Sequence, residues 1–140
     1  MEIDTEQEDE MNDTPLERFT REYHRNEVIF EENSFGNEMY IVHSGKVKLF
    51  TRDDTGEQVT VSIVEKGGFF GEMTLIDGSP RSTAAVAEED TCLITLDKPK
   101  FFYMVQQQPR FAFTIMHTLC ERIRGANLLL AKAKGKEAPE

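Results

Sequence analysis

One short segment of the chain carries the residue types needed to hold a phosphate group and a sugar together. Residues 70–85, between two apolar runs, combine glycines, a carboxylate, an arginine and two hydroxyls. Arg81 can form a two-pronged hydrogen bond with a phosphate, and Ser82 and Thr83 can donate hydroxyl hydrogen bonds to the same oxygens. Glu72 only accepts hydrogen bonds, so it suits a sugar hydroxyl and would repel a phosphate.

The backbone of the same segment is expected to contribute to binding. Gly71 lets the chain approach a ligand closely and turn into a helical segment. Residues 72–76 then offer free N–H groups at a helix N-terminus, which attract an anion. Met73 and Thr74 lie in this first turn, and Phe70 ends the apolar run before it. These residues therefore complete the predicted ligand-binding set of the segment.

This segment resembles the phosphate-binding cassette of cyclic nucleotide-binding domains. The family pattern is met here by Phe70, Gly71, Glu72, Met73, Pro80, Arg81, Ser82 and Ala84. The resemblance implies that Glu72 binds the ribose 2′-hydroxyl and that Arg81 pairs with the cyclic phosphate. It also implies that Ser82 and the backbone of residues 71–73 complete the phosphate site. The alternative is a plain hairpin connection in which Arg81 and Glu72 form an ion pair.

Short apolar runs and alternating apolar residues around the cassette predict short β-strands. The predicted strands cover residues 40–42, 46–50, 59–63, 84–87 and 92–96. Val47 and Leu49 alternate with lysines, which is typical of a half-buried strand. After a turn, Val59, Val61 and Ile63 resume the alternation. Short strands with glycine-rich turns indicate an all-β barrel or a double sheet.

The resemblance extends to the fold. Residues 35–50 look like the second signature of the family, which is a turn followed by Tyr-Ile-Val, a glycine and an alternating strand. Asn33 stands where the family often has glycine, and asparagine tolerates the left-handed conformation. The expected fold class is mainly β with flanking helices: a small double-stranded jelly-roll β-barrel plus an N-terminal helix and a long C-terminal helix.

The flanking helices are predicted from apolar spacing and from prolines. The first starts at Thr14 and Pro15, and Leu16, Phe19 and Tyr23 follow at helical spacing. The second opens at residues 98–100, with an apolar side of Phe101, Phe102 and Val105. Pro109 ends it and starts the last helix, which runs for roughly six turns to Leu130.

The last helix carries two apolar stripes. The first comprises Phe113, Met116, Cys120, Ile123, Asn127 and Leu130, and the second comprises Ile115, Leu119, Ala126 and Leu129. One face could cover the β core while the other meets a partner helix, and a buried Asn127 could then set the pairing. A helix that lies wholly against its own domain is the alternative. The resemblance favours a homodimer, because bacterial members of the receptor-protein type pair through this helix.

The resemblance also bears on which base is bound. Ala126 and Asn127 fall where bacterial relatives place polar contacts to the purine, and only Asn127 can hydrogen-bond. Asn127 is therefore expected to contact the base from its own or the other subunit, unless it is solvated or pairs with its copy. Ser82 is compatible with cAMP, whereas cGMP-selective members prefer Thr there. The expected ligand is thus cAMP, with cGMP as the alternative, and Glu72 argues against a cyclic dinucleotide.

Length and charge favour a single domain with polar tails. The chain has 140 residues and a net charge of −10. Residues 1–13 hold seven of the 26 acidic residues and no base, so they are expected to be disordered. The binding domain is expected to span residues 14–131, followed by a disordered tail at 132–140. Outside the acidic tail, 19 acids face 16 bases, which does not indicate a nucleic-acid partner.

Several other classes of function are not expected. No apolar run is long enough for a membrane span, and the N-terminus lacks a signal core, so a cytoplasmic location is predicted. Only a short tail follows Leu130, so no helix-turn-helix DNA-binding unit is expected. Cys92 and Cys120 are predicted to be small core residues. The three histidines are scattered, so no metal site, cofactor or catalytic group is predicted.

The sequence therefore predicts a non-enzymatic sensor that binds a cyclic mononucleotide and signals by moving its C-terminal helix. A ligand can shift that helix only by binding one arrangement better than the other. An effector protein could read this movement. The alternatives are a ligand-free dimerisation scaffold, the detached sensor domain of a channel, kinase or transcription factor, and a cupin-like metalloenzyme.

Overall fold

The computed structural model describes residues 19–137, which divide between Tyr103 and Met104 into a β-rich unit and a helical unit. The strands are β1 (Thr20–Tyr23), β2 (Val28–Phe30), β3 (Met39–Ser44), β4 (Lys46–Arg52), β5 (Gln58–Glu65), β6 (Phe69–Phe70), β7 (Ala84–Ala87) and β8 (Thr91–Leu96). The helices are α2 (Glu72–Asp77), α3 (Lys98–Gln107) and α4 (Pro109–Glu137). Every strand predicted from the sequence is present.

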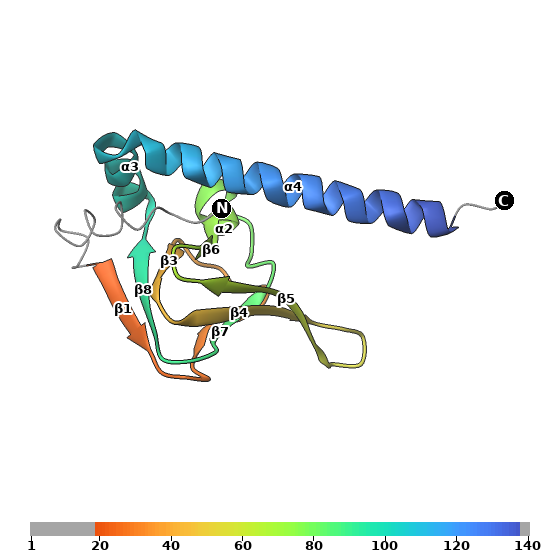
Figure 1. Ribbon diagram of the computed structural model, residues 1–140. Helices are drawn as coiled ribbons and strands as arrows, with labels where there is room; N and C mark the ends of the chain where they lie inside the picture. Colours follow the sequence, from red (N-terminus) through yellow and green to blue (C-terminus); the bar gives the residue numbers. More distant parts are fainter. Residues whose placement is uncertain (1–18, 138–140) are drawn as a thin grey trace. The chain divides into compact units, whose positions relative to one another are not determined.

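The strands form two antiparallel sheets of four strands each (Figure 1). One sheet has the order β1-β8-β3-β6 and the other has the order β2-β7-β4-β5. Apolar side chains from both sheets make one core, with Tyr40, Val42 and Leu93 from the first sheet and Val47 and Ala85 from the second. The predicted double-sheet fold with flanking helices is therefore confirmed.

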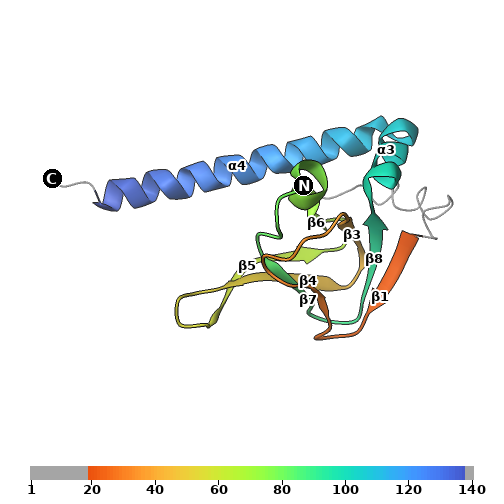
Figure 2. The same cartoon turned by 180° about the vertical axis from the view of Figure 1, so that it is seen from behind.

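In the β4–β5 hairpin, the predicted strands are correct, but the predicted buried face of β5 is wrong. Both strands form, and in Figures 1 and 2 their hairpin reaches beyond the other strands of the unit. However, Val59, Val61 and Ile63 are 47%, 57% and 43% exposed, so the side that the alternation suggests as buried is open. The reason is the register with β4, in which Val64 rather than Ile63 lies opposite the buried Val47 and is itself buried.

The prediction of a helix through Tyr23 is wrong. Residues 20–23 form β1, in which Tyr23 is buried and lies opposite Thr91 of β8. Backbone pairing with β8 outweighs the helical spacing of the apolar residues, because that spacing constrains only side-chain positions. The predicted helix start at Thr14 and the acidic segment 1–13 lie outside the described residues.

The helical unit differs from expectation in length and in its buried residues. Helix α4 starts at Pro109 as predicted, but it continues to Glu137 and so covers most of the segment predicted to be a disordered tail. In α3 the buried side chain is Met104, while Phe102 of the predicted apolar side is 61% exposed. None of the helices within residues 19–137 is long and apolar enough to cross a membrane.

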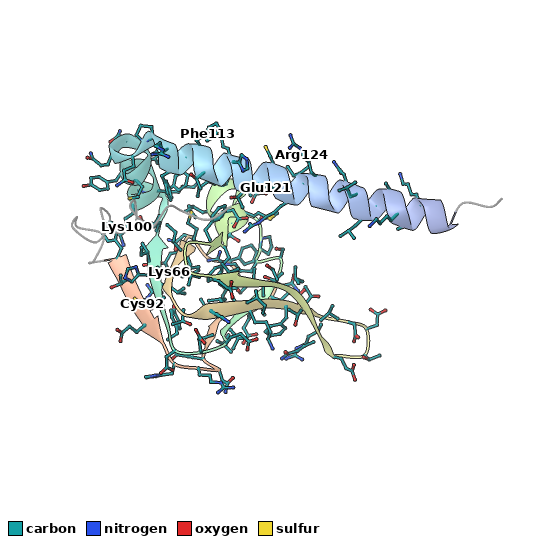
Figure 3. All side chains as sticks on the ribbon, viewed as in Figure 1. Lys66, Cys92, Lys100, Phe113, Glu121 and Arg124 are labelled. Atoms are coloured by element: carbon teal, nitrogen blue, oxygen red, sulfur yellow. The ribbon has the colours of Figure 1, made fainter. Side chains whose placement is uncertain are left out.

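The predicted stripes of α4 also divide differently in the structure. The buried side chains are Phe111, Ile115 and Thr118, which follow one another at steps of four and three residues. Members of the first predicted stripe are exposed by more than half, namely Phe113, Met116, Ile123 and Leu130. Figure 3 labels Phe113 near the start of α4 and Arg124 farther along it. This stripe therefore remains available as a surface of the described chain.

Candidate ligand-binding site

The cassette folds around a short helix bounded by two glycines. Gly71 precedes α2 with a φ of 79°, and Gly78 follows it with a φ of 72°. Both angles lie in the left-handed region that glycine adopts without steric cost. The N–H of Gly78 donates to the carbonyl oxygen of Thr74 at 3.0 Å and closes the helix. The predicted turn at Gly71 into a helical segment is confirmed.

Arg81 is the central buried cation of the cassette, with a side chain that is only 3% exposed. Its Nη1 donates to the carbonyl oxygen of Gly71 at 2.9 Å, and its Nη2 donates to that of Glu38 at 2.8 Å. Its backbone is fixed as well: the N–H of Arg81 donates to Ser34 O, and the N–H of Asn33 donates to Arg81 O, both at 2.8 Å. The guanidinium is therefore held between α2 and the loop before β3.

The guanidinium retains unused hydrogen-bonding capacity. Nε of Arg81 is buried and has no hydrogen-bond partner among residues 19–137. Burial lowers the pKa of Arg81, although the charges of Tyr40, Glu38 and Glu72 oppose this shift. A guanidinium has five N–H donors, and an unsatisfied buried donor is costly. A buried arginine with a spare donor is therefore suited to an incoming anion.

Aromatic rings cover the face of this guanidinium. Its Cζ lies 4.4 Å from the ring centroid of Phe30 and 5.7 Å from that of Tyr40. Tyr40 in turn stacks on Phe70, with centroids 5.1 Å apart and an interplanar angle of 21°. A cation over an aromatic face is attracted by the ring quadrupole. The rings therefore stabilise the charge of Arg81 without using its N–H donors.

Two glycines leave room for the guanidinium. A Cβ placed on Gly36 would lie 2.5 Å from Nη2 of Arg81, and one placed on Gly71 would lie 2.7 Å from Nη1. Real side chains do not tolerate such distances. The loop before β3 and the start of α2 must therefore both carry glycine for Arg81 to occupy its place.

The other predicted cassette residues have different environments. Glu72 and Thr74 are each only 5% exposed, whereas Met73 on the same helix is 51% exposed. Ser82 is exposed and Thr83 is half-buried. Phe70 is 1% exposed and belongs to the core between the sheets. Of these cassette residues, Glu72, Thr74 and Arg81 are therefore buried polar residues close to Gly71, and Phe70 lies in the core.

Asn127 belongs to the other unit of the chain. Its side chain is exposed on α4, in the helical unit that starts at Met104. The proposed contact between Asn127 and a base therefore stays a prediction.

Four contributors to the environment of Arg81 were not singled out as site residues from the sequence. They are Phe30, Gly36, Glu38 and Tyr40, which come from β2, β3 and the loop between them. Glu38 acts through its carbonyl oxygen, which any residue possesses, so no sequence signal could identify it. The left-handed Asn33 of this loop has a φ of 67°, and this conformation was correctly anticipated.

The remaining chemistry-bearing residues do not gather into a site. Within the described part of the chain, no group of three or more His, Cys, Asp and Glu residues could hold a metal ion. Cys92 and Cys120 are free thiols. Cys92 on β8 (Figure 3) is half-buried, and burial raises its pKa. Cys120 is exposed, so its prediction as a core residue is wrong.

Comparison with known families and structures agrees with this geometry. The model of the cyclic nucleotide-binding domain matches residues 20–108. The cyclic AMP receptor protein of Thermus thermophilus is 35% identical over 127 residues, which are 90% of this chain and 59% of that protein. A cAMP-dependent protein kinase regulatory subunit of Aspergillus fumigatus is 33% identical over 79 residues, which are 56% of this chain and 18% of that subunit.

Solved structures show the same fold. The crystal structure of the Thermus thermophilus catabolite activator protein has a TM-score of 0.79 at 35% identity and covers 89% of this chain and 59% of its own. A structure from a cyclic-GMP-dependent signalling pathway in bacterial phytopathogenesis has a TM-score of 0.70 at 26% identity and covers 89% of this chain and 98% of its own. The chain spans about three fifths of the Thermus receptor protein. On the match over residues 20–108, this chain belongs to the cyclic nucleotide-binding domain family.

Proposed function

We propose that this protein binds a cyclic mononucleotide, preferably cAMP, and acts as a non-enzymatic regulatory module. The supporting observation is Arg81, a buried guanidinium with a spare Nε donor in the loop between α2 and β7. An anion that reaches this group would replace lost hydration with a charge-assisted hydrogen bond. The family match supports a cyclic nucleotide as that anion.

Each cassette residue then has a proposed role. Arg81 pairs with the cyclic phosphate, together with Ser82, Thr83 and the backbone of residues 71–73. Glu72, a buried acceptor, takes the ribose 2′-hydroxyl. Phe70, Met73 and Thr74 complete the ligand-binding set predicted from the sequence. Asn127 is proposed to read the edge of the purine.

The preference for cAMP has two supports. Ser82 follows the cassette arginine directly, and the receptor protein from Thermus thermophilus that this chain resembles is named for cyclic AMP. A similar structure comes from a cyclic-GMP-dependent pathway, so cGMP is the natural competitor. A cytoplasmic location also remains a prediction.

Calorimetric titration of the full chain with cAMP and cGMP, side by side, tests this function. We expect cAMP to bind at least about tenfold more tightly than cGMP, a difference of ~1.4 kcal/mol. The open-chain 5′-AMP serves as a control with the same base and an altered phosphate. Absence of heat and of any thermal shift with millimolar cAMP and cGMP would contradict the proposal and favour a ligand-free scaffold.

The carboxylate of Glu72 provides a test of the sugar contact. Glu72→Gln is expected to weaken cAMP binding by about tenfold, because a hydrogen bond to a charged group contributes roughly 1.5–3 kcal/mol. The loss should shrink for 2′-deoxy-cAMP, which lacks the hydroxyl. Titrating both ligands against both proteins completes a thermodynamic cycle. Equal losses for the two ligands would remove the ribose role of Glu72.

The proposed output is a change in the C-terminal helix within a homodimer. A stripe of α4 leaves Phe113, Met116 and Ile123 exposed by more than half, and large exposed apolar patches are typical of interaction sites. Ligand binding would act by favouring one arrangement of the helices over another. A longer protein or a separate effector would then read this arrangement.

The homodimer is tested by placing a charge in this stripe. Ile123→Glu is expected to convert a dimer into a monomer, because an unpaired carboxylate is costly to bury at an apolar interface. Sedimentation velocity measures the change. Arg124→Gln is the matched control, since it also changes the net charge by −1, at an exposed neighbour outside the stripe. A wild-type chain that sediments as a monomer with and without cAMP would exclude this interface.

A further inference from the structure

We infer that Phe30 is a positioning residue for Arg81: its ring holds the guanidinium in the orientation that receives the ligand phosphate. This inference rests on the proposed function for its effect on binding, but its structural content concerns only Phe30 and Arg81. It adds a residue outside the cassette to the determinants of ligand affinity.

Three contacts define the plane of the guanidinium. The carbonyl oxygens of Gly71 and Glu38 hold its Nη1 and Nη2 edges at 2.9 and 2.8 Å. The ring of Phe30 covers its face, with Cζ only 4.4 Å from the centroid. Tyr40 is farther away at 5.7 Å, so Phe30 makes the closer of the two ring contacts. The group without a protein partner is Nε, within the described residues.

Phe30 is itself held in place by the fold. It lies on β2 opposite Ala85 of β7, the strand that follows Arg81 in sequence. Its ring centroid is 5.9 Å from those of Tyr40 and Phe70, which belong to the other sheet. The ring therefore spans the two sheets, and its position depends on the packing of both. A planar group stacked on such a ring has little freedom to tilt.

The ring also offsets part of the cost of burying Arg81. Burial of the guanidinium disfavours its charged form, and a desolvated cation gains more from an aromatic face than an exposed one does. The carbonyl oxygens supply dipoles but no charge. Without the ring, the guanidinium would gain freedom to turn toward other acceptors, and a phosphate would have to reorder it on binding.

The first measurement follows Arg81 directly, in the ligand-free chain of 140 residues. The Nε–H resonance of Arg81 in a ¹⁵N-labelled sample is identified by its loss in Arg81→Lys. We expect Phe30→Leu to accelerate the exchange of this proton with water, whereas Phe30→Tyr retains the wild-type exchange rate; the chemical shift is not used, because loss of the ring current changes it in any case. Leu49→Ala is the control for core packing, because Leu49 lies opposite Ala85 from the other side and packs on the same core.

The second measurement is cAMP affinity by calorimetry. Phe30→Leu is expected to weaken binding by about threefold to thirtyfold, which matches the range of cation–π energies. Phe30→Tyr should bind like the wild type, and Leu49→Ala should lower the unfolding temperature without a comparable loss of affinity.

The outcomes separate the two hypotheses. An unchanged exchange rate of the Nε proton in Phe30→Leu, or equal affinity losses in Phe30→Leu and Leu49→Ala, would overturn the positioning role. A wild-type protein that binds no cyclic nucleotide would instead overturn the proposed function. In that case the exchange rate of the Arg81 Nε proton would still decide whether Phe30 orients it.

Discussion

Replacement of Arg81 by alanine is expected to weaken cAMP binding by about thirtyfold at the least and by up to about four-thousandfold. Truncating one partner of a buried, hydrogen-bonded charge pair costs roughly 2–5 kcal/mol. Arg81 is 3% exposed, so little water can take the place of its charge beside a bound phosphate. Calorimetry with cAMP measures the loss.

The same change should also destabilise the ligand-free fold. The carbonyl oxygens of Gly71 and Glu38 accept their hydrogen bonds from this side chain. Each carbonyl left buried without a partner costs about 1–3 kcal/mol. Arg81→Lys is therefore the companion variant, because it keeps a charge and N–H donors but lacks the planar fork. It should remain folded and still bind cAMP more weakly than the wild type.

An exposed arginine supplies the matched control for Arg81. Arg52 also donates to a carbonyl oxygen, that of Gly56 at 3.0 Å, but it lies at the exposed end of the β4–β5 hairpin. Arg52→Ala removes the same charge from the protein and should leave cAMP affinity within about twofold, since exposed pairs contribute little. If both arginine variants lost affinity equally, the effect would come from net charge rather than from a phosphate site at Arg81.

Gly71→Ala is the second substitution with a large expected effect. The left-handed backbone costs a residue with a side chain about 1–2 kcal/mol, and the added Cβ would lie 2.7 Å from Nη1 of Arg81. The guanidinium must then move, and its hydrogen bond to the Gly71 carbonyl is lost. We expect cAMP affinity to fall by about thirtyfold or more, as for other losses of a buried charge contact.

Gly78 at the other end of α2 offers a control for the free-energy cost of the left-handed backbone alone. Its φ of 72° is nearly the same as that of Gly71, but nothing lies within 4 Å of an added Cβ. Gly78→Ala should therefore cost only the strain of about 1–2 kcal/mol in unfolding free energy. Thermal unfolding and cAMP titration of both variants separate strain from displacement of Arg81. Similar affinities for the two variants would contradict the close fit at Gly71.

All of these substitutions test the contacts that hold the guanidinium of Arg81 in one position. The glycines allow its approach, the carbonyls of Gly71 and Glu38 hold its edges, and Phe30 covers its face. A phosphate would then meet a cation that is already oriented. Such preorganisation increases affinity by lowering the ordering cost of binding.

The cassette was predictable because its requirements are local. Gly71, Glu72 and Arg81 lie within eleven consecutive positions, so their spacing along the chain limits how far apart they can lie. The left-handed conformation of Asn33 was likewise predictable, because it depends on the backbone preferences of one residue. The strands at residues 46–50 and 59–63 followed from a period of two, which the chain carries whether or not its partners are known.

The sides of elements were less predictable. The helical spacing through Tyr23 and the alternation around Val61 are present in the sequence. However, residues 20–23 pair with β8 as a strand, and the register of β5 with β4 buries Val64 rather than Val61. Pairing partners and edge positions are properties of the whole sheet. A periodic pattern indicates which residues share one face of an element, but it does not indicate whether that face packs against the core or is exposed to solvent.

By itself, the sequence determined five of the eight strands and the turn at Gly71, and it pointed to Arg81 as the arginine proposed to bind an anion, since these depend on local propensity and on side-chain chemistry. Only the tertiary structure decided what surrounds that arginine. The carbonyl of Glu38 lies 43 residues away along the chain, and the ring of Phe30 arrives through the pairing of β2 with β7. Every residue has a carbonyl group, so the sequence cannot indicate which carbonyl contacts Arg81. An aromatic ring meets its partner only through tertiary packing, so the sequence alone does not predict this contact either.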